Sequence, residues 1–192
     1  MSFYTEEELQ SLHLGSYGKD VKISRHARLY NPQNMFLGSH VRIDDFCMLS
    51  ASATEPFRLD DYIHISAGVY IFGTAGLHIH SFCNISSGTK VYTVSDTFSG
   101  DVLVGPSVPT SYRGVVSAKL VLPKHVWIGP NSVVLPGVSI GEGCAIGAMS
   151  FVRKSCDAWS IYGGNPLRFL KKRSQKAKEL EAQFISDEAK TH

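Results

Sequence analysis

The sequence predicts an all-β chain folded as a parallel β-helix of about six triangular coils, with a short N-terminal helix, an inserted loop and a C-terminal α-helix. Three observations support this fold class: apolar residues recur at every sixth position, the frame slips only after every third repeat, and both ends of the chain lose the repeat. A period of six matches neither an α-helix nor a single strand. The repeated positions are Tyr17, Ile23, Leu29, Leu37, Ile43, Leu49, Leu59, Ile65, Ile71, Ile79, Ile85, Val91, Leu122, Ile128, Val134, Ile140, Ile146 and Val152.

Three repeats per coil indicate a prism with three sides, each a short strand whose apolar residue points inward, with turn residues at the corners. The fifth residue of each repeat is small or β-branched in most units, so we expect it to face the interior as well. All four cysteines occupy this fifth position: Cys47, Cys83, Cys144 and Cys156. We therefore expect buried, unpaired thiols, and neither disulfides nor a metal site.

The elements follow in order along the chain. Residues 1–16 form an N-terminal helical cap, because Thr5 and Glu8 have the spacing of a capping box. Residues 17–165 form the β-helix domain, interrupted by an inserted loop at 93–119. Residues 166–192 form a C-terminal helix and tail, with an amphipathic basic helix expected from about Leu167 to Phe184.

Composition excludes several classes of protein. The 192 residues carry a net charge of only +2, which gives no reason to expect a nucleic-acid partner. No apolar run has the length of a membrane span, and the first residues lack the features of a signal peptide. We expect a cytoplasmic protein.

Two stretches carry a resemblance to a known family: "VWIGPNSVVLPGVSIGEGCAIGAMSFVRK" and "IYGGNPLRFLKKR". With the repeat, they make the chain resemble the hexapeptide-repeat acyltransferases, in particular the galactoside and xenobiotic O-acetyltransferases and the acetyltransferases of polysaccharide biosynthesis. The resemblance implies a left-handed β-helix and a homotrimer with active sites between neighbouring prisms. It also implies acetyl-CoA as co-substrate, and no metal is expected.

The resemblance also places the donor site. Two small side chains would line the passage of the pantetheine arm along the fifth and sixth coils, and four basic side chains would meet the phosphates, because Arg and Lys pair strongly with phosphate. These residues are Pro130, Ala148, Arg153, Lys154, Arg168 and Lys171.

The catalytic base is less clear, because the family's histidine at the start of the inserted loop is missing. No histidine occurs between Cys83 and Lys124, and Asp96 takes the family's histidine position. Three alternatives stay open. Asp96 is the base; or another histidine serves, His64 before His80; or the acceptor is an amine, which attacks without a strong base.

The acceptor pocket is expected near His64. The repeat places His64, Asn84 and Trp127 in one column along an edge of the prism, and Ser66 lies two residues after His64. By resemblance to the family, Ser66, Asn84 and Trp127 are candidates for binding the acceptor.

These features together predict an acetyl-CoA-dependent O-acetyltransferase acting on a sugar hydroxyl in surface polysaccharide or O-antigen biosynthesis. An N-acetyltransferase of a nucleotide-linked amino sugar is the alternative. Two remoter alternatives are a zinc carbonic anhydrase-like enzyme, suggested by His64, His78 and His80, and a non-catalytic β-helix.

Overall fold

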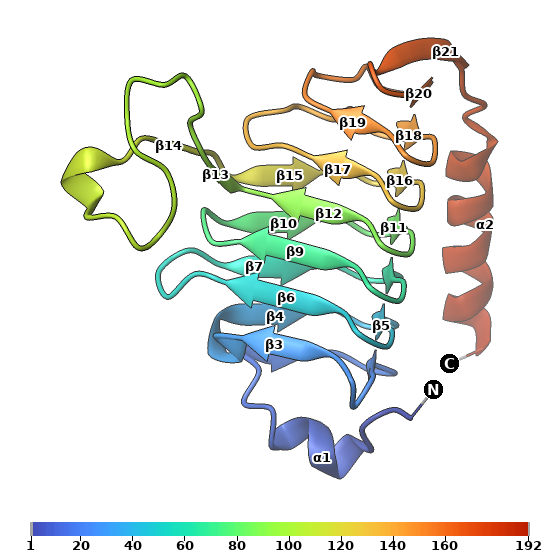
Figure 1. Ribbon diagram of the computed structural model, residues 1–192. Helices are drawn as coiled ribbons and strands as arrows, with labels where there is room; N and C mark the ends of the chain where they lie inside the picture. The colour runs from blue at the N-terminus through green and yellow to red at the C-terminus, as the bar shows by residue number, and fades with distance from the viewer. Residues whose placement is uncertain (1, 192) are drawn as a thin grey trace.

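The computed structural model describes residues 2–191 and shows short strands stacked into an elongated prism (Figure 1). Met1 and His192, at the outer ends of the expected cap and tail, lie outside the described residues. The architecture is the left-handed parallel β-helix that the sequence predicted, with the expected helices at its two ends.

Three sheets form the sides of the prism, and equivalent strands of successive coils pair in parallel. The first sheet contains β1 (Ser16–Tyr17), β4 (Met35–Leu37), β7 (Phe57–Leu59), β10 (Leu77–Ile79) and β15 (Leu120–Leu122). The second contains β2 (Lys22–Ile23), β5 (Arg42–Ile43), β8 (His64–Ile65), β11 (Asn84–Ile85), β16 (Trp127–Ile128), β18 (Ala145–Ile146) and β20 (Ser160–Gly163). The third contains β3 (Arg28–Tyr30), β6 (Met48–Ala51), β9 (Tyr70–Gly73), β12 (Lys90–Tyr92), β17 (Val133–Val134) and β19 (Phe151–Val152). Strand β20 adds the start of a seventh coil to the six that the repeat indicated.

The repeated apolar residues form the core, as expected. Ile65 pairs in register with Ile43 below it and Ile85 above it, so identical positions stack along the axis of the prism. The repeat positions from Ile23 onward are buried, apart from Leu29, which packs with Tyr17 against the core. All four cysteines are buried and free, which confirms their interpretation as small core residues.

One corner of the prism is built from residues in the left-handed backbone conformation. His40, Tyr62, Phe82, His125 and Trp159 all have φ between 50° and 63°, which costs roughly 1–2 kcal/mol for a residue with a Cβ. Their rings stack from coil to coil, with 4.6 Å between the centroids of His40 and Tyr62 and 5.0 Å between those of Tyr62 and Phe82. This stacking offsets part of the backbone cost and gives the corner a ridge of stacked rings.

Short helices and turns complete the N-terminal half. Helix α1 (Glu6–Gln10) begins at the expected capping box of Thr5 and Glu8, and Leu9 is buried against the first coil. The turn η1 (Pro32–Asn34) joins the first coil to the second.

The C-terminal segment differs from the expected helix at 167–184. Its first residues form a strand, β21 (Arg168–Lys172), which pairs antiparallel with β20. Helix α2 begins later and covers Lys176–Thr191. The physical reason is that β20 is the last parallel strand and offers unpaired backbone groups along its edge, which the returning chain satisfies.

The inserted loop projects away from the prism on the side opposite α2 (Figure 1). It contains a two-stranded hairpin, β13 (Val94–Asp96) and β14 (Val115–Ser117), and the turn η2 (Thr110–Tyr112). Several of its large apolar side chains are exposed: Phe98, Val102, Leu103, Val104, Tyr112, Val115 and Val116. Among residues 2–191, no helix combines the length and the apolar character that crossing a bilayer requires.

Candidate active site

Asp96 lies at the mouth of a cavity at the base of the inserted loop. It is the last residue of β13 and pairs in register with Val115 of β14. Its Oδ2 accepts a hydrogen bond from the backbone N–H of Gly105 at 3.2 Å, whereas Oδ1 accepts none from residues 2–191. The side chain is therefore held by the loop and keeps one oxygen available.

The cavity beside Asp96 has a volume of about 510 Å³. Apart from polar residues at positions 95–97 and 99, its lining is apolar and comes from the loop and the fifth coil: Phe98, Val116, Leu135 and Pro136. A carboxylate at the edge of an apolar cavity can accept a proton from a nucleophile that approaches an acyl group bound there.

His64 lies elsewhere, on the outward face of the second sheet, in a network with two charged residues. Its Nε2 is 2.8 Å from Asp44 Oδ2, and Arg42 Nε donates to Asp44 Oδ1 at 2.6 Å. Burial alone would raise the pKa of the Asp44 carboxyl, but the hydrogen bonds from Arg42 and His64 lower it below its usual range. The Asp44 carboxylate therefore fixes the orientation of the His64 ring through Nε2.

The column predicted from the repeat is present. Asn84 pairs in register with His64 on one side and with Trp127 on the other. Asn84 Oδ1 is buried and has no hydrogen-bond partner among the described residues. Leaving a buried amide oxygen unpaired costs about 1–3 kcal/mol, so Asn84 Oδ1 is a position where a bound molecule or a water could donate a hydrogen bond.

A second column runs beside the first, two residues further along each strand, and its side chains become smaller toward the C-terminal coils. Ser66 and Ser86 precede Gly129 and Gly147 in this column, joined by backbone hydrogen bonds between successive coils. A Cβ added at Gly129 would lie 2.7 Å from the backbone N of Ala148. The backbones therefore approach closely here and form a smooth surface. Ser86 was not identified from the sequence, where a serine at a corner resembles any other turn residue.

The residues expected to bind the donor arm lie at this same corner. Pro130 and Ala148 follow Gly129 and Gly147, and the backbone N–H of Met149 donates to the carbonyl of Pro130 at 2.8 Å. Ala148 is exposed and Pro130 is partly so. The structure thus brings the two predicted residues together on adjacent coils.

The four cations expected to meet phosphates are all exposed near the end of the prism. Arg153 and Lys154 directly follow β19, and Arg168 and Lys171 lie on β21. None of them forms an ion pair with a described residue. By contrast, Arg173 donates hydrogen bonds to the carbonyl oxygens of His125 and Gly143 and so joins the C-terminal segment to the fifth and sixth coils.

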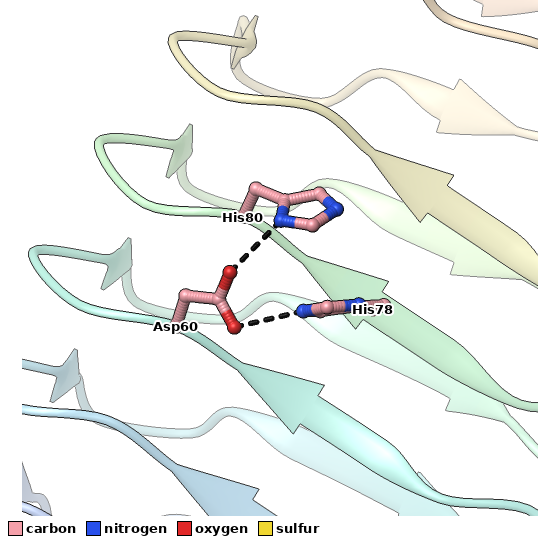
Figure 2. Close-up of side chains that lie close together, drawn as sticks. All are labelled: Asp60, His78 and His80. Atoms are coloured by element: carbon pink, nitrogen blue, oxygen red, sulfur yellow. Dashed lines mark hydrogen bonds and ion pairs between the residues drawn. The ribbon is translucent and has the colours of Figure 1, made fainter.

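His80 belongs to a separate cluster. Its Nδ1 is 2.9 Å from Asp60 Oδ2, and His78 Nε2 is 2.8 Å from Asp60 Oδ1, so the two imidazoles face one carboxylate (Figure 2). Within the described part of the chain, no hydrogen bond or ion pair joins Asp96 to His64 or His80. The three candidate bases are therefore three separate sites.

Comparisons with known proteins bear on the family of this chain and on the chemical nature of the acceptor. Residues 121–154 match the family described as "Bacterial transferase hexapeptide (six repeats)". The chain is 39% identical to a dTDP-4-amino-4,6-dideoxy-D-glucose acyltransferase of Escherichia coli, over 96% of this chain and 95% of that one. It is 26% identical to a putative lipopolysaccharide biosynthesis O-acetyl transferase of Escherichia coli strain K12, over 78% of this chain and 74% of the other.

Among solved structures, the chain is similar to AntD, an N-acyltransferase from Bacillus cereus, in complex with dTDP and 3-hydroxybutyryl-CoA. The identity is 45%, the TM-score is 0.94, and 98% of each chain is covered. A further AntD structure, of a serine variant, contains dTDP-4-amino-4,6-dideoxyglucose and coenzyme A, with a TM-score of 0.93 and 45% identity over 97% of this chain and 98% of that one.

These findings correct the expectation of a sugar hydroxyl as acceptor, which was wrong. The relatives that match nearly the whole chain act on an amino sugar, and AntD is an N-acyltransferase. The missing loop histidine was the signal in the sequence that pointed this way, because a hydroxyl needs a stronger base than an amine does.

Proposed function

This chain belongs to the hexapeptide-repeat acyltransferases, and we propose that it transfers an acyl group from an acyl-coenzyme A to the amino group of a nucleotide-linked 4-amino-4,6-dideoxy sugar. The observation that carries the proposal is the likeness to AntD, which extends over 98% of both chains and includes complexes with dTDP and with coenzyme A or its acyl thioester. The acyl-coenzyme A is a co-substrate, in agreement with the donor predicted from the sequence.

The proposed chemistry is an aminolysis of a thioester. The neutral amine attacks the thioester carbonyl, a C–N bond forms and the C–S bond breaks. The nitrogen becomes acidic as it attacks, so a carboxylate is a sufficient base for its proton. Asp96 takes this proton and coenzyme A leaves with it as the free thiol, so that the products are an amide and a thiol.

Variants of AntD support the choice of Asp96. The solved variants replace one serine and one aspartate that lie ten positions apart in AntD. In this chain Ser86 and Asp96 are also ten positions apart. Ser86 directly follows β11 and lies in the column of small side chains, and we place it on the acceptor side with Asn84, Ser66 and Trp127.

The proposal also requires more than one copy of the chain. Ser86 precedes β12 (Lys90–Tyr92) by four residues and Asp96 follows it by four, and no hydrogen bond joins their side chains among the described residues. A site that contains both is completed between neighbouring prisms. The exposed apolar side chains of the loop, such as Phe98 and Val116, provide a surface that a second copy covers. We therefore retain the homotrimer as part of the proposal.

In this arrangement the phosphates of coenzyme A meet Arg153, Lys154, Arg168 and Lys171. Its pantetheine arm passes Pro130 and Ala148 toward the cavity beside Asp96. The unpaired exposed cations and the close backbone approach at Gly129 support this route.

A paired acceptor assay tests the proposed function. Thiol release from acetyl-CoA and from 3-hydroxybutyryl-CoA is followed with dTDP-4-amino-4,6-dideoxyglucose, and separately with dTDP-6-deoxyglucose, which carries a hydroxyl at the same carbon. We expect a kcat/KM at least about a hundredfold higher for the amino sugar, because only the amine suits a carboxylate base. Equal rates for the two acceptors, or a preference for the hydroxyl, would refute the proposal.

A further inference from the structure

The cluster of Asp60, His78 and His80 takes no part in the proposed reaction and has the composition of a metal site. His78 lies on β10 and His80 directly follows it, while Asp60 directly follows β7 in the coil below. Side chains two positions apart in extended chain point the same way. The backbone N–H of Asp60 bonds to the carbonyl of Ile79, so the three side chains meet on one outward surface (Figure 2).

The donor atoms are close enough to share one ion. Those of the three side chains all lie within 4.8 Å of one another, and the ring centroids of His78 and His80 are 4.0 Å apart. Ligands of a tetrahedral zinc at about 2.0–2.2 Å are themselves separated by about 3.4 Å. Small rotations of the side chains therefore bring the nitrogens and the carboxylate oxygen into position.

The surroundings allow a cation to bind. The side chains of His78, His80 and Asp60 are 25%, 36% and 36% exposed, so an ion reaches them from solvent. Arg58 pairs in register with His78, but its guanidinium lies over the Phe36 ring, 4.6 Å from the centroid. Asp60 has no described ion-pair partner besides the two histidines.

We propose that Asp60, His78 and His80 bind a divalent transition-metal ion, and that zinc is the ion that fits these ligands best. Imidazole nitrogens select zinc and its neighbours over magnesium or calcium, and three protein ligands leave one position of a tetrahedral zinc for water. The ion replaces the two protons that the histidines share with Asp60 and joins the third coil to the fourth. This site departs from the sequence-based expectation of no metal, and it is independent of the proposed acyl transfer.

The test is a zinc titration of the full-length protein after chelator treatment and dialysis, by calorimetry, with cobalt(II) absorption as a second readout of coordination geometry. We expect one zinc per chain for the wild type, and at least about tenfold weaker binding for His78→Gln and for His80→Gln. At the same zinc concentration, zinc should raise the melting temperature of the wild type more than that of these two variants.

His40→Gln is the matched control, because His40 Nδ1 lies 3.4 Å from Asp20 with no third ligand grouped with them in the described chain. It should bind zinc like the wild type, and circular dichroism checks that every variant is folded. The proposal is overturned if the wild type binds no zinc, or if the two cluster variants bind it as tightly as the wild type does.

Discussion

At the scale of single residues, the proposed chemistry depends on a carboxylate in the place where related enzymes are expected to use a histidine. Asp96 is anchored through Oδ2 by the N–H of Gly105 and borders an apolar cavity. His64 is anchored as well, by Asp44, but it lies on the second sheet beside Asn84. These positions suggest a division of roles in which Asp96 moves the proton and the column of His64 and Asn84 contacts the acceptor.

Replacing Asp96 with Asn should lower kcat by roughly 10²–10⁴-fold, the usual contribution of a positioned base. The Michaelis constant for the acyl-coenzyme A should change little, because the amide keeps the shape of the side chain. Steady-state kinetics with the amino sugar measure both quantities.

Asp101→Asn is the control for this prediction, because Asp101 is an exposed carboxylate of the same loop. It should retain the activity of the wild type. If Asp96→Asn also retains it, the base lies elsewhere, and a matching loss in His64→Gln would identify it.

The residues of the site were accessible to sequence reasoning to different degrees. The column of His64, Asn84 and Trp127 follows from the repeat alone, because a fixed period places equivalent positions in register. Ser86 did not stand out, because a serine at a corner resembles any other turn residue, and only its position beside the neighbouring coils distinguishes it. From the sequence, His78 and His80 were grouped with His64, whereas the structure groups them with Asp60 of the coil below. That contact depends on the register between the third and fourth coils, across the insertion in the repeat.

At the scale of elements, helix α2 is fastened to the corner ridge by polar and aromatic contacts. Glu181 accepts hydrogen bonds from Lys124 and His125 at 2.6 and 2.7 Å. Phe184 packs edge-on against Tyr62 at 5.1 Å between centroids, and Tyr62 donates to Glu188. The sequence indicated a basic amphipathic helix here, but it placed the start too early, because pairing of β21 with the edge of β20 cannot be read from periodicity.

Glu181→Gln should lower the free energy of unfolding by about 1–3 kcal/mol. The substitution removes the negative charge of the carboxylate that pairs with the buried His125, the only such carboxylate among the described residues. Burial alone would raise the pKa of the Glu181 carboxyl, but hydrogen bonds from Lys124 and His125 lower it. A carboxyl whose pKa is lower in the folded state contributes stability above its unfolded pKa, near 4.3, and loses it as pH falls through the folded value.

Thermal unfolding between pH 3 and pH 7 tests this prediction. The difference between the wild type and Glu181→Gln should be largest near neutral pH and should shrink in the acidic range. Glu179→Gln, an exposed position on the same helix, should behave like the wild type throughout. A difference that does not depend on pH would show that the charge of Glu181 is not what fastens the helix.

At the scale of the whole molecule, our proposal places the functional groups along edges of the prism and completes the site with a second copy of the chain. The repeat predicts the six coils of the prism, because each is specified by the same local rule, but it does not reach β20 and β21, which lie beyond the last repeat. The site is specified less well, because in our proposal it combines an edge of one prism with the loop of another, and no local rule relates the two. For this reason the fold was predictable from the sequence and the acceptor was not.

A mixing experiment tests whether the site is shared between chains. Asp96→Asn removes the base, and Ser86→Tyr obstructs the acceptor side; each variant alone should be nearly inactive. When the two are co-expressed and assemble at random, roughly one interface in four carries both intact halves in a cyclic oligomer. Co-purified mixtures should therefore recover about a quarter of wild-type activity, and light scattering should give the mass of three chains. Mixtures that remain inactive would place both residues in a site within one chain.

The central claim is that the acyl group goes to nitrogen, and the structure of the product tests it most directly. The product formed from dTDP-4-amino-4,6-dideoxyglucose and acetyl-CoA is isolated and its linkage is determined by NMR. We predict an amide at the amino-bearing carbon, with every sugar hydroxyl free. An ester on a ring hydroxyl beside an unmodified amine would contradict the account.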